Sequence, residues 1–165
     1  MTSHYGFFNE LRHKYGSHRI EETRQIYISC MRVFCMLPLA AVVTGTGPSA
    51  GKRALIIHGG VPSIRNDYNM VTIDELRELH HHRLVPVRDW RDRADHLLFA
   101  SLWSDPKDVM PGSPPGQSWW PTVLGARATR GAPFGPAVTE AFLAKNSLDV
   151  VIRAHELPAE QRGYQ

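Results

Sequence analysis

The sequence has no long hydrophobic run. No stretch of eighteen or more consecutive apolar residues occurs, so a transmembrane helix is not predicted. The first residues, Met-Thr-Ser-His-Tyr-Gly, lack the basic and then apolar layout of a secretory signal. Cys30 and Cys35 are too few for a disulfide framework or a four-cysteine zinc site. These absences predict a chain of a reducing compartment, cytoplasmic or nuclear, with no membrane partner.

An excess of one charge is also missing. Lys and Arg number 19 against 16 Asp and Glu, which gives a formal net charge of +3. The densest basic group lies between Arg83 and Arg93, where Asp89 and Asp92 are interleaved with the arginines. A mixed-charge solvated loop is therefore favoured over a nucleic-acid interface, and no nucleic-acid partner is expected. With 42% hydrophobic and 21% charged residues, the composition is that of one globular domain or part of one.

A helix with one buried face is predicted between Glu21 and Leu37, because apolar residues recur there at three- and four-residue steps. Pro38 would end it. Both cysteines lie on this stretch and are interpreted as core residues. The predicted buried face consists of Ile26, Cys30, Val33, Phe34 and Leu37.

Two apolar runs, 39–43 and 54–57, flank a segment rich in Gly, Pro and Ser. This order predicts a β-hairpin with a long turn over 44–53. Thr72-Ile-Asp-Glu75 matches a capping box, so a helix is expected to begin there. The side chains that this helix should bury are Ile73, Leu76 and Leu79.

The second half of the chain alternates between apolar runs and turn-forming residues. The run 97–103 is expected to be a third strand, stopped by Ser104-Asp105-Pro106. Residues 107–129 are rich in Pro and Gly and predict a long surface loop inserted into the domain. Gly135-Pro136 opens another helix, and residues 148–153 are expected to form the last strand. Val138, Phe142 and Leu143 should share one side of that helix.

Two of the expected strands run into a histidine, His58 after 54–57 and His155 after 148–153. Open α/β sheets place ligands at the carboxyl ends of their strands, and imidazole is a common metal ligand. A carboxylate such as Glu156 or Asp105 could orient a ring. From spacing alone, a hydrogen-bonded structural role is still favoured over metal ligation for each histidine.

Two other candidate sites are disfavoured. The turn 44–53 ends in Gly-Lys but lacks the spacing of a phosphate-binding P-loop, and a strand rather than a helix follows, so a hairpin tip is favoured. His80-His-His82 suggests a metal cluster, but consecutive helix residues point in different directions. A solvated helix end is the favoured interpretation of these histidines.

The chemistry-bearing segments occur in the order found in the phosphoprotein phosphatases, which they resemble. The four motifs are His58-Gly-Gly60, Leu102-Trp-Ser-Asp-Pro106, Arg130-Gly131 followed by Phe134-Gly135, and Ile152-Arg-Ala-His-Glu156. Members of this family are metal-dependent protein serine/threonine phosphatases, and the block 134–143 looks most like the tetratricopeptide-containing, type-five branch. The resemblance implies an α/β (α+β) fold, a metallophosphoesterase β-sandwich flanked by helices.

The resemblance also implies roles for individual residues. His58 and His155 would be ligands of one of two divalent metal ions of manganese, iron or zinc. Arg130 would bind the substrate phosphate, because a guanidinium presents a planar fork of donors. Asp105 would support the site through hydrogen bonds. The implied partners are phosphoprotein substrates, with regulatory subunits or a targeting domain as further candidates.

Other family motifs have no counterpart in the sequence. Gly-Asp-x-His-Gly, Gly-Asp-x-Val-Asp-Arg-Gly and Gly-Asn-His-Glu are missing, and with them the bridging Asp and the general-acid His of the family. We therefore expect no catalytic residue here, and residues 1–165 to be a partial calcineurin-like phosphoesterase domain with little or no activity by itself. Two alternatives remain open: a fragment of a protein serine/threonine phosphatase, or a pseudophosphatase that acts as a binding module.

Overall fold

The computed structural model describes residues 5–16, 18–62, 71–85, 92–106 and 134–156. The chain divides into two compact units, one formed by residues 1–37 with 82–84 and the other by 38–81 with 85–165. The expected loop insertion at 107–129 and the candidate Arg130 lie outside the described residues. In the described segments, no helix combines the length and apolar character needed to cross a membrane.

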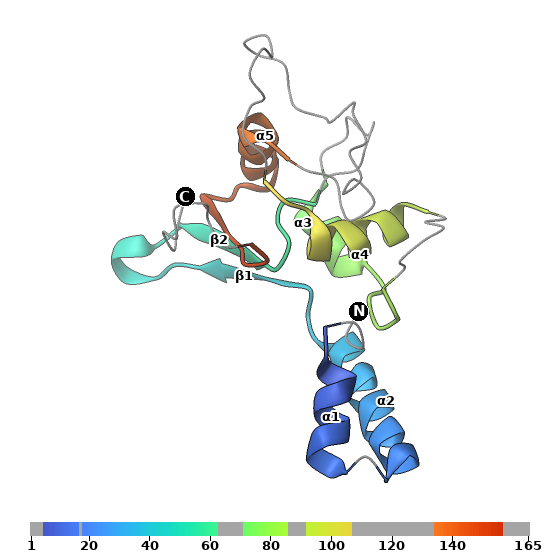
Figure 1. The fold of residues 1–165 in the computed structure, drawn as a ribbon. Helices are drawn as coiled ribbons and strands as arrows, with labels where there is room; N and C mark the ends of the chain where they lie inside the picture. Colours follow the sequence, from blue (N-terminus) through green and yellow to red (C-terminus); the bar gives the residue numbers. More distant parts are fainter. Residues whose placement is uncertain (1–4, 17, 63–70, 86–91, 107–133, 157–165) are drawn as a thin grey trace. The chain divides into compact units, whose positions relative to one another are not determined.

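The first unit is a pair of helices, α1 (Phe7–Tyr15) and α2 (Ile20–Met36) (Figure 1). Aromatic rings join them, because Tyr27 on α2 lies with its ring centroid 6.1 Å from that of Phe7 and 5.2 Å from that of Phe8. Leu11 is buried on α1 and Thr23 on α2. The predicted helix over 21–37 is therefore confirmed to within a residue at each end.

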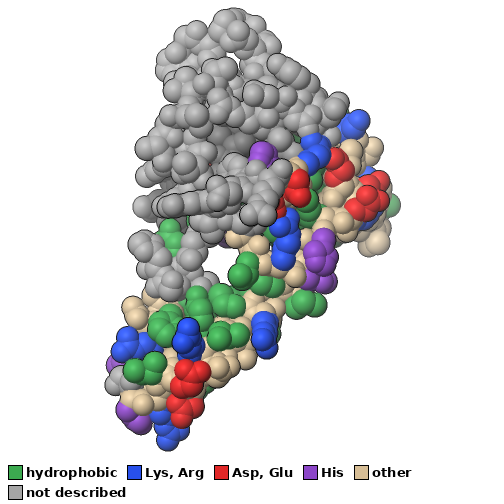
Figure 2. Space-filling view, turned by 90° about the vertical axis from the view of Figure 1, so that its right-hand side faces the viewer, with side chains coloured by type: hydrophobic (Ala, Val, Ile, Leu, Met, Phe, Trp, Pro, Cys, Tyr) green, Lys and Arg blue, Asp and Glu red, His purple; other side chains and the backbone are tan. Residues whose placement is uncertain are grey.

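The predicted burial of one face of α2 was wrong for most of its residues. Val33, Phe34 and Leu37 are 58%, 46% and 54% exposed, and both cysteines are only half-buried. An apolar stripe at helical spacing indicates which face of a helix can pack against another element, but not whether another element covers that face. In Figure 2 hydrophobic side chains gather on the surface of this helical pair, in the lower part of the view.

The second unit holds a three-stranded sheet in the order β1-β2-β3. β1 (Ala40–Thr44) pairs antiparallel with β2 (Arg53–Ile57), which confirms the predicted hairpin, and its tip contains a short 3-10 turn, η1 (Gly47–Ser49). β2 pairs in parallel with β3 (Val150–Ile152), which is shorter than the expected strand over 148–153. Asp149 accepts hydrogen bonds from Lys52 Nζ and the Arg53 amide, at 2.6 and 2.8 Å.

One face of this sheet is covered and the other is exposed. Leu55 and Ile57 of β2 are 1% and 4% exposed and belong to a core to which all three helices of the unit contribute. The helical members of the core include Ile73 of α3, Leu97 and Leu98 of α4, and Val138 and Phe142 of α5. On the opposite face, side chains between 43% and 51% exposed come from all three strands: Val43, Ile56, Val150 and Ile152. The described part thus has helices on one side of a small mixed sheet, an α/β arrangement without the second sheet of a complete sandwich.

The residues 97–103, expected as a strand, form the C-terminal part of a helix, α4 (Arg93–Trp103). The helix begins in charged sequence, where the Asp92 carboxylate accepts a hydrogen bond from the Asp95 amide at 2.8 Å and caps it. Five consecutive residues are buried: Leu97, Leu98, Phe99, Ala100 and Ser101. A short, fully buried apolar run carries no period that separates a strand from a helix, and this is why the prediction was wrong.

The other two helices begin as predicted. α3 (Ile73–Glu78) has a complete capping box between Thr72 and Glu75, and Pro136 occupies the first turn of α5 (Pro136–Asn146). α3 ends at Glu78, so His80–His82 follow the helix instead of forming its end. The buried Asn146 amide connects α5 to α3, because it accepts a hydrogen bond from the Ile73 amide at 2.7 Å and donates to the Val71 carbonyl at 3.0 Å.

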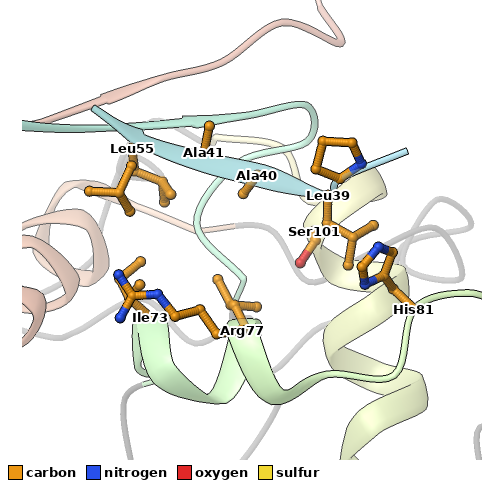
Figure 3. Close-up of a pocket in the computed structure, with 11 residues that line it drawn as sticks. Leu39, Ala40, Ala41, Leu55, Ile73, Arg77, His81 and Ser101 are labelled. Carbon is orange, nitrogen blue, oxygen red and sulfur yellow. The ribbon is translucent and has the colours of Figure 1, made fainter. Parts of the chain in front are cut away.

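A pocket of about 360 Å³ lies on the covered side of the sheet. Figure 3 shows Ala40 and Leu55 pointing from the strands toward Ile73 and Arg77 of α3, with Ser101 of α4 facing them. His81 lies at one side of this space and is the histidine of its lining. The pocket is therefore separate from the two strand-end histidines.

Candidate metal centre

The sheet topology brings the two strand-end histidines together. Because β2 and β3 are parallel, their carboxyl ends lie at the same edge, and the Ala154 amide extends the pairing by donating to the His58 carbonyl at 3.2 Å. His155 Nδ1 lies 3.2 Å from His58 Nε2, and the ring centroids are 5.1 Å apart at 75°. His58 is exposed and His155 is half-buried. The structure therefore places these two predicted site residues in contact.

The glycines after His58 are explained by the close approach of other segments. The Gly59 amide donates to the Ser101 carbonyl at 2.9 Å, and a Cβ on Gly59 would lie 2.7 Å from both the Leu102 carbonyl carbon and the Trp103 amide nitrogen. A Cβ on Gly60 would overlap the ring of Phe134. Only glycine lets the end of α4 pack this tightly against the loop that carries His58.

His155 occupies an unusual backbone conformation. Its φ is +70°, and the Glu156 amide donates across it to the Ala154 carbonyl at 2.9 Å, which forms a γ-turn. A positive φ is costly for a residue with a side chain, and such residues cluster at functional sites. With the backbone in this turn, the His155 ring lies against the ring of His58.

Two residues of the segment at the end of α4 surround the His155 ring. The Asp105 carboxylate has Oδ1 3.5 Å from His155 Nε2, the ring nitrogen that does not face His58. The Trp103 ring meets the imidazole edge to face, with centroids 5.3 Å apart at 82°. Phe99 stacks on Trp103 from one turn earlier in the helix, at 5.9 Å and 14°. Asp105, rather than Glu156, is therefore the carboxylate that faces the imidazole.

Arg153 was not singled out from the sequence, yet it connects the whole group. Its Nε donates to the Gly59 carbonyl, its Nη2 lies 3.3 Å from Asp105 Oδ1, and its Nη1 lies 3.3 Å from Glu156 Oε2. The signal was present in the strand alternation, since Arg153 directly follows β3 and lies two positions after Val151, on the face that Val151 occupies if the alternation continues. A largely buried guanidinium needs hydrogen-bond acceptors, and the acceptors of Arg153 belong to the segments that carry the two histidines and Asp105.

Electrostatics favour a neutral His58. Partial desolvation lowers the pKa of His58 below 6.5, and electrostatic interaction with His155 and with the Arg153 guanidinium lowers it further. A neutral imidazole has a lone pair available for a metal ion, whereas a protonated one does not. The environment of His58 therefore suits a ligand at neutral pH.

The spacing of the two ring nitrogens fits a shared ion. Nitrogens that bind one ion at about 2.0–2.1 Å, with about 90–109° between them, lie about 2.8–3.4 Å apart. The 3.2 Å between His58 Nε2 and His155 Nδ1 falls in that range. Across the described ranges, no set of three or more His, Cys, Asp or Glu side chains is placed to hold an ion. The described residues thus offer a pair of ligands, with Asp105 behind one of them.

Known proteins resemble this chain along its full length. Residues 4–159 match the calcineurin-like phosphoesterase family. Serine/threonine-protein phosphatase 5 of Homo sapiens is 35% identical over 167 residues, which cover 100% of this chain and 26% of that protein. Serine/threonine-protein phosphatase T of Trypanosoma brucei brucei is 30% identical over 165 residues, which cover 27% of that protein.

The serine/threonine-protein phosphatase 4 catalytic subunit of Saccharomyces cerevisiae is 29% identical over 165 residues, 41% of its length. The chain therefore spans between about a quarter and two fifths of these curated relatives. The type-five enzyme expected from the block 134–143 is among the matches. The chain belongs to the calcineurin-like phosphoesterase family, and the relatives that it matches are serine/threonine-protein phosphatases.

Proposed function

We propose that the chain is part of a protein serine/threonine phosphatase catalytic domain, in which His58 and His155 are ligands of the same divalent metal ion. The observation that carries this proposal is the 3.2 Å contact between His58 Nε2 and His155 Nδ1 at the carboxyl ends of two parallel strands. Asp105 supports His155 from its other ring nitrogen. Arg130, a proposal from the resemblance, binds the phosphate of a phosphoserine or phosphothreonine protein.

Each residue has a defined part in this proposal. When bound, an ion of manganese, iron or zinc polarises a phosphoryl oxygen and activates water for attack on phosphorus. The protein holds the two imidazoles in register through the parallel pairing of β2 and β3. It also keeps His58 unprotonated at neutral pH, because burial lowers the pKa of that ring. Cytoplasmic or nuclear location and regulatory partners remain predictions.

The centre is incomplete within the residues that the sequence supplies. Two adjacent cations repel each other, and anionic ligands must screen that repulsion. His58 and His155 are neutral ligands, and the sequence lacks the family motifs that carry the bridging carboxylate. We therefore propose that these 165 residues have little or no turnover by themselves and bind a single ion through the histidine pair.

A second candidate is a pseudophosphatase, a catalytically inactive binding module. It is favoured by the fact that the two ring nitrogens, 3.2 Å apart, are within hydrogen-bonding distance of each other. The pair is therefore satisfied without an ion. Metal binding by the histidine pair separates the two candidates, because a module of this kind has no need of it.

Cobalt(II) binding followed by visible absorption tests the proposal, since the ion reports its ligands in its spectrum. The chain should bind one cobalt ion, and His58→Ala and His155→Ala should abolish binding. His13→Ala, on an exposed position of α1, is the matched control and should bind like the parent. Undiminished binding by His58→Ala would overturn the metal assignment.

Turnover of p-nitrophenyl phosphate with added manganese tests the second part of the proposal. The parent chain should show none above background. Manganese-dependent turnover that His58→Ala abolishes would show that the centre is complete, and would contradict the proposed inactivity of these residues by themselves.

A further inference from the structure

Three loop segments meet at one guanidinium. Arg153 follows β3, and its side chain is only 18% exposed. Its donors reach the Gly59 carbonyl after β2, the Asp105 carboxylate after α4 and the Glu156 carboxylate in the γ-turn of His155. These segments also carry His58, the carboxylate that faces His155, and His155 itself. Each element of the proposed site is thus tied to Arg153 within one or two residues.

We propose that Arg153 is the positioning residue of the metal centre: it sets the separation of the two imidazoles and aims the Asp105 carboxylate at His155 Nε2. The inference rests on the proposed function, because it assigns Arg153 a role toward the same ion. Arg153 itself does not contact the ion. It acts through the two residues that flank the histidines and through Asp105.

Geometry explains why this role needs arginine. A guanidinium presents five donors in a rigid plane, so it can hold acceptors in three directions at once. A lysine in its place keeps the charge but has one compact ammonium on a flexible stem, and it cannot satisfy Gly59, Asp105 and Glu156 together. The guanidinium fork fixes where the Asp105 oxygens point.

The consequence for His155 concerns its two ring nitrogens. Asp105 Oδ1 lies 3.5 Å from His155 Nε2. A carboxylate that faces Nε2 favours the tautomer with the proton there, which leaves the lone pair on Nδ1, the nitrogen 3.2 Å from His58. Partners of this kind behind a metal-binding histidine change metal affinity about ten- to a hundredfold when they are removed. Arg153 orients the Asp105 carboxylate, so the loss of Arg153 should lower the metal affinity even though Arg153 does not contact the ion.

The same contacts could serve folding alone, and the experiment must separate the two roles. A purely structural ion pair changes stability but leaves the ligands of the folded protein in place. A positioning residue changes the cobalt affinity and spectrum of the folded protein, and the protonation of His155 Nε2 in the absence of metal. Arg77 offers a control for the loss of an arginine ion pair, because it pairs with Asp74 at 2.7 Å on α3 and has no part in the group around His58 and His155.

Cobalt affinity should be measured for the parent chain, Arg153→Lys, Arg153→Gln and Arg77→Gln. Both Arg153 variants should bind cobalt about ten- to a hundredfold more weakly, with an altered spectrum, and Arg77→Gln should match the parent. Asp105→Asn and Arg153→Gln should be non-additive in the double variant, since Arg153 acts through Asp105. Parent affinity and spectrum in Arg153→Lys would overturn the inference.

A metal-free measurement keeps the test independent of the ion. Two-bond proton–nitrogen NMR correlations of the imidazoles should show His155 protonated at Nε2 in the parent, and a mixture of tautomers in Arg153→Lys. If Arg153→Gln does not fold, Arg153→Lys gives the answer. An unchanged tautomer in Arg153→Lys would refute the positioning role. Failure of the parent to bind cobalt, or binding retained by His155→Ala, would instead refute the proposed function.

Discussion

Threonine in place of three apolar residues on the exposed face of the sheet should sharply reduce self-association of the chain. The side chains of Ile56, Val150 and Ile152 are 43%, 45% and 51% exposed. Leu55, next to Ile56 on β2 but on the covered face, is only 1% exposed. Among the described strands, β1 and β3 are the two edges of the sheet, and strand edges promote pairing with other chains. We therefore expect the parent chain to associate or to remain partly unfolded.

The magnitude follows from the exposed fractions. Full burial of a Val or Ile side chain contributes about 1.5–3 kcal/mol, so covering the exposed half of each contributes about 1 kcal/mol. The three substitutions together should therefore weaken association by about 3 kcal/mol, which is on the order of a hundredfold in the association constant. Threonine keeps the β-branched shape, so the strands themselves should be retained.

Sedimentation velocity across a concentration series measures this effect. The triple variant should remain monomeric at concentrations where the parent forms larger species, and Leu55→Thr, on the covered face, should make association worse because it damages the core. A parent chain that is a monomer with a sharp, cooperative thermal transition would refute the reasoning. So would a triple variant that associates as strongly as the parent.

Three further outcomes are expected. Gly59→Ala should lower the free energy of unfolding by about 1–3 kcal/mol through overpacking, because the added Cβ would lie 2.7 Å from backbone atoms at the end of α4. Hydrogen exchange of the neighbouring amides measures this loss of stability. The hydrogen bond from Lys52 lowers the pKa of Asp149 below 3.8, and Asp149 raises that of Lys52 above 10.5. Protection of the Arg53 amide, which donates to Asp149, should therefore be lost as the pH falls below 3.8 through the lowered pKa of that carboxyl group, and Asp149→Ala should lack that dependence. In a proton NMR titration His58 should titrate below 6.5, because burial disfavours its charged form, and it should shift upward in His155→Ala; an unchanged titration in that variant would contradict the coupling.

Local signals in the sequence predicted much of the fold. The capping box at Thr72, the proline at the start of α5 and the hairpin runs each depend on neighbours along the chain, and all three were confirmed. The run 97–103 was different, because its burial on all sides removes the alternation that marks a strand or the stripe that marks a helix. The structure shows the helix capped by Asp92, in the charged sequence before the run, and the prediction of a strand did not use that residue.

The two histidines and the nearby carboxylate of Asp105 were singled out from the sequence, whereas Arg153 was not. The placement of His58 and His155 at strand ends was sufficient to expect them at one edge, and parallel pairing brings them into contact. The hydrogen bonds of Arg153 join residues 94 and 48 positions away. No local pattern specifies contacts of that range, and the γ-turn at His155 likewise appears only in the backbone geometry. Arg130 lies outside the described residues and stays a prediction.

X-ray absorption at the zinc edge of the zinc-loaded chain tests the central claim most directly. We expect two imidazole nitrogens at about 2.0–2.1 Å from the ion in the parent, and loss of this bound-zinc signal in His58→Ala and in His155→Ala. A zinc environment without imidazole scattering, or one that neither substitution changes, would contradict the assignment of this histidine pair as the metal centre.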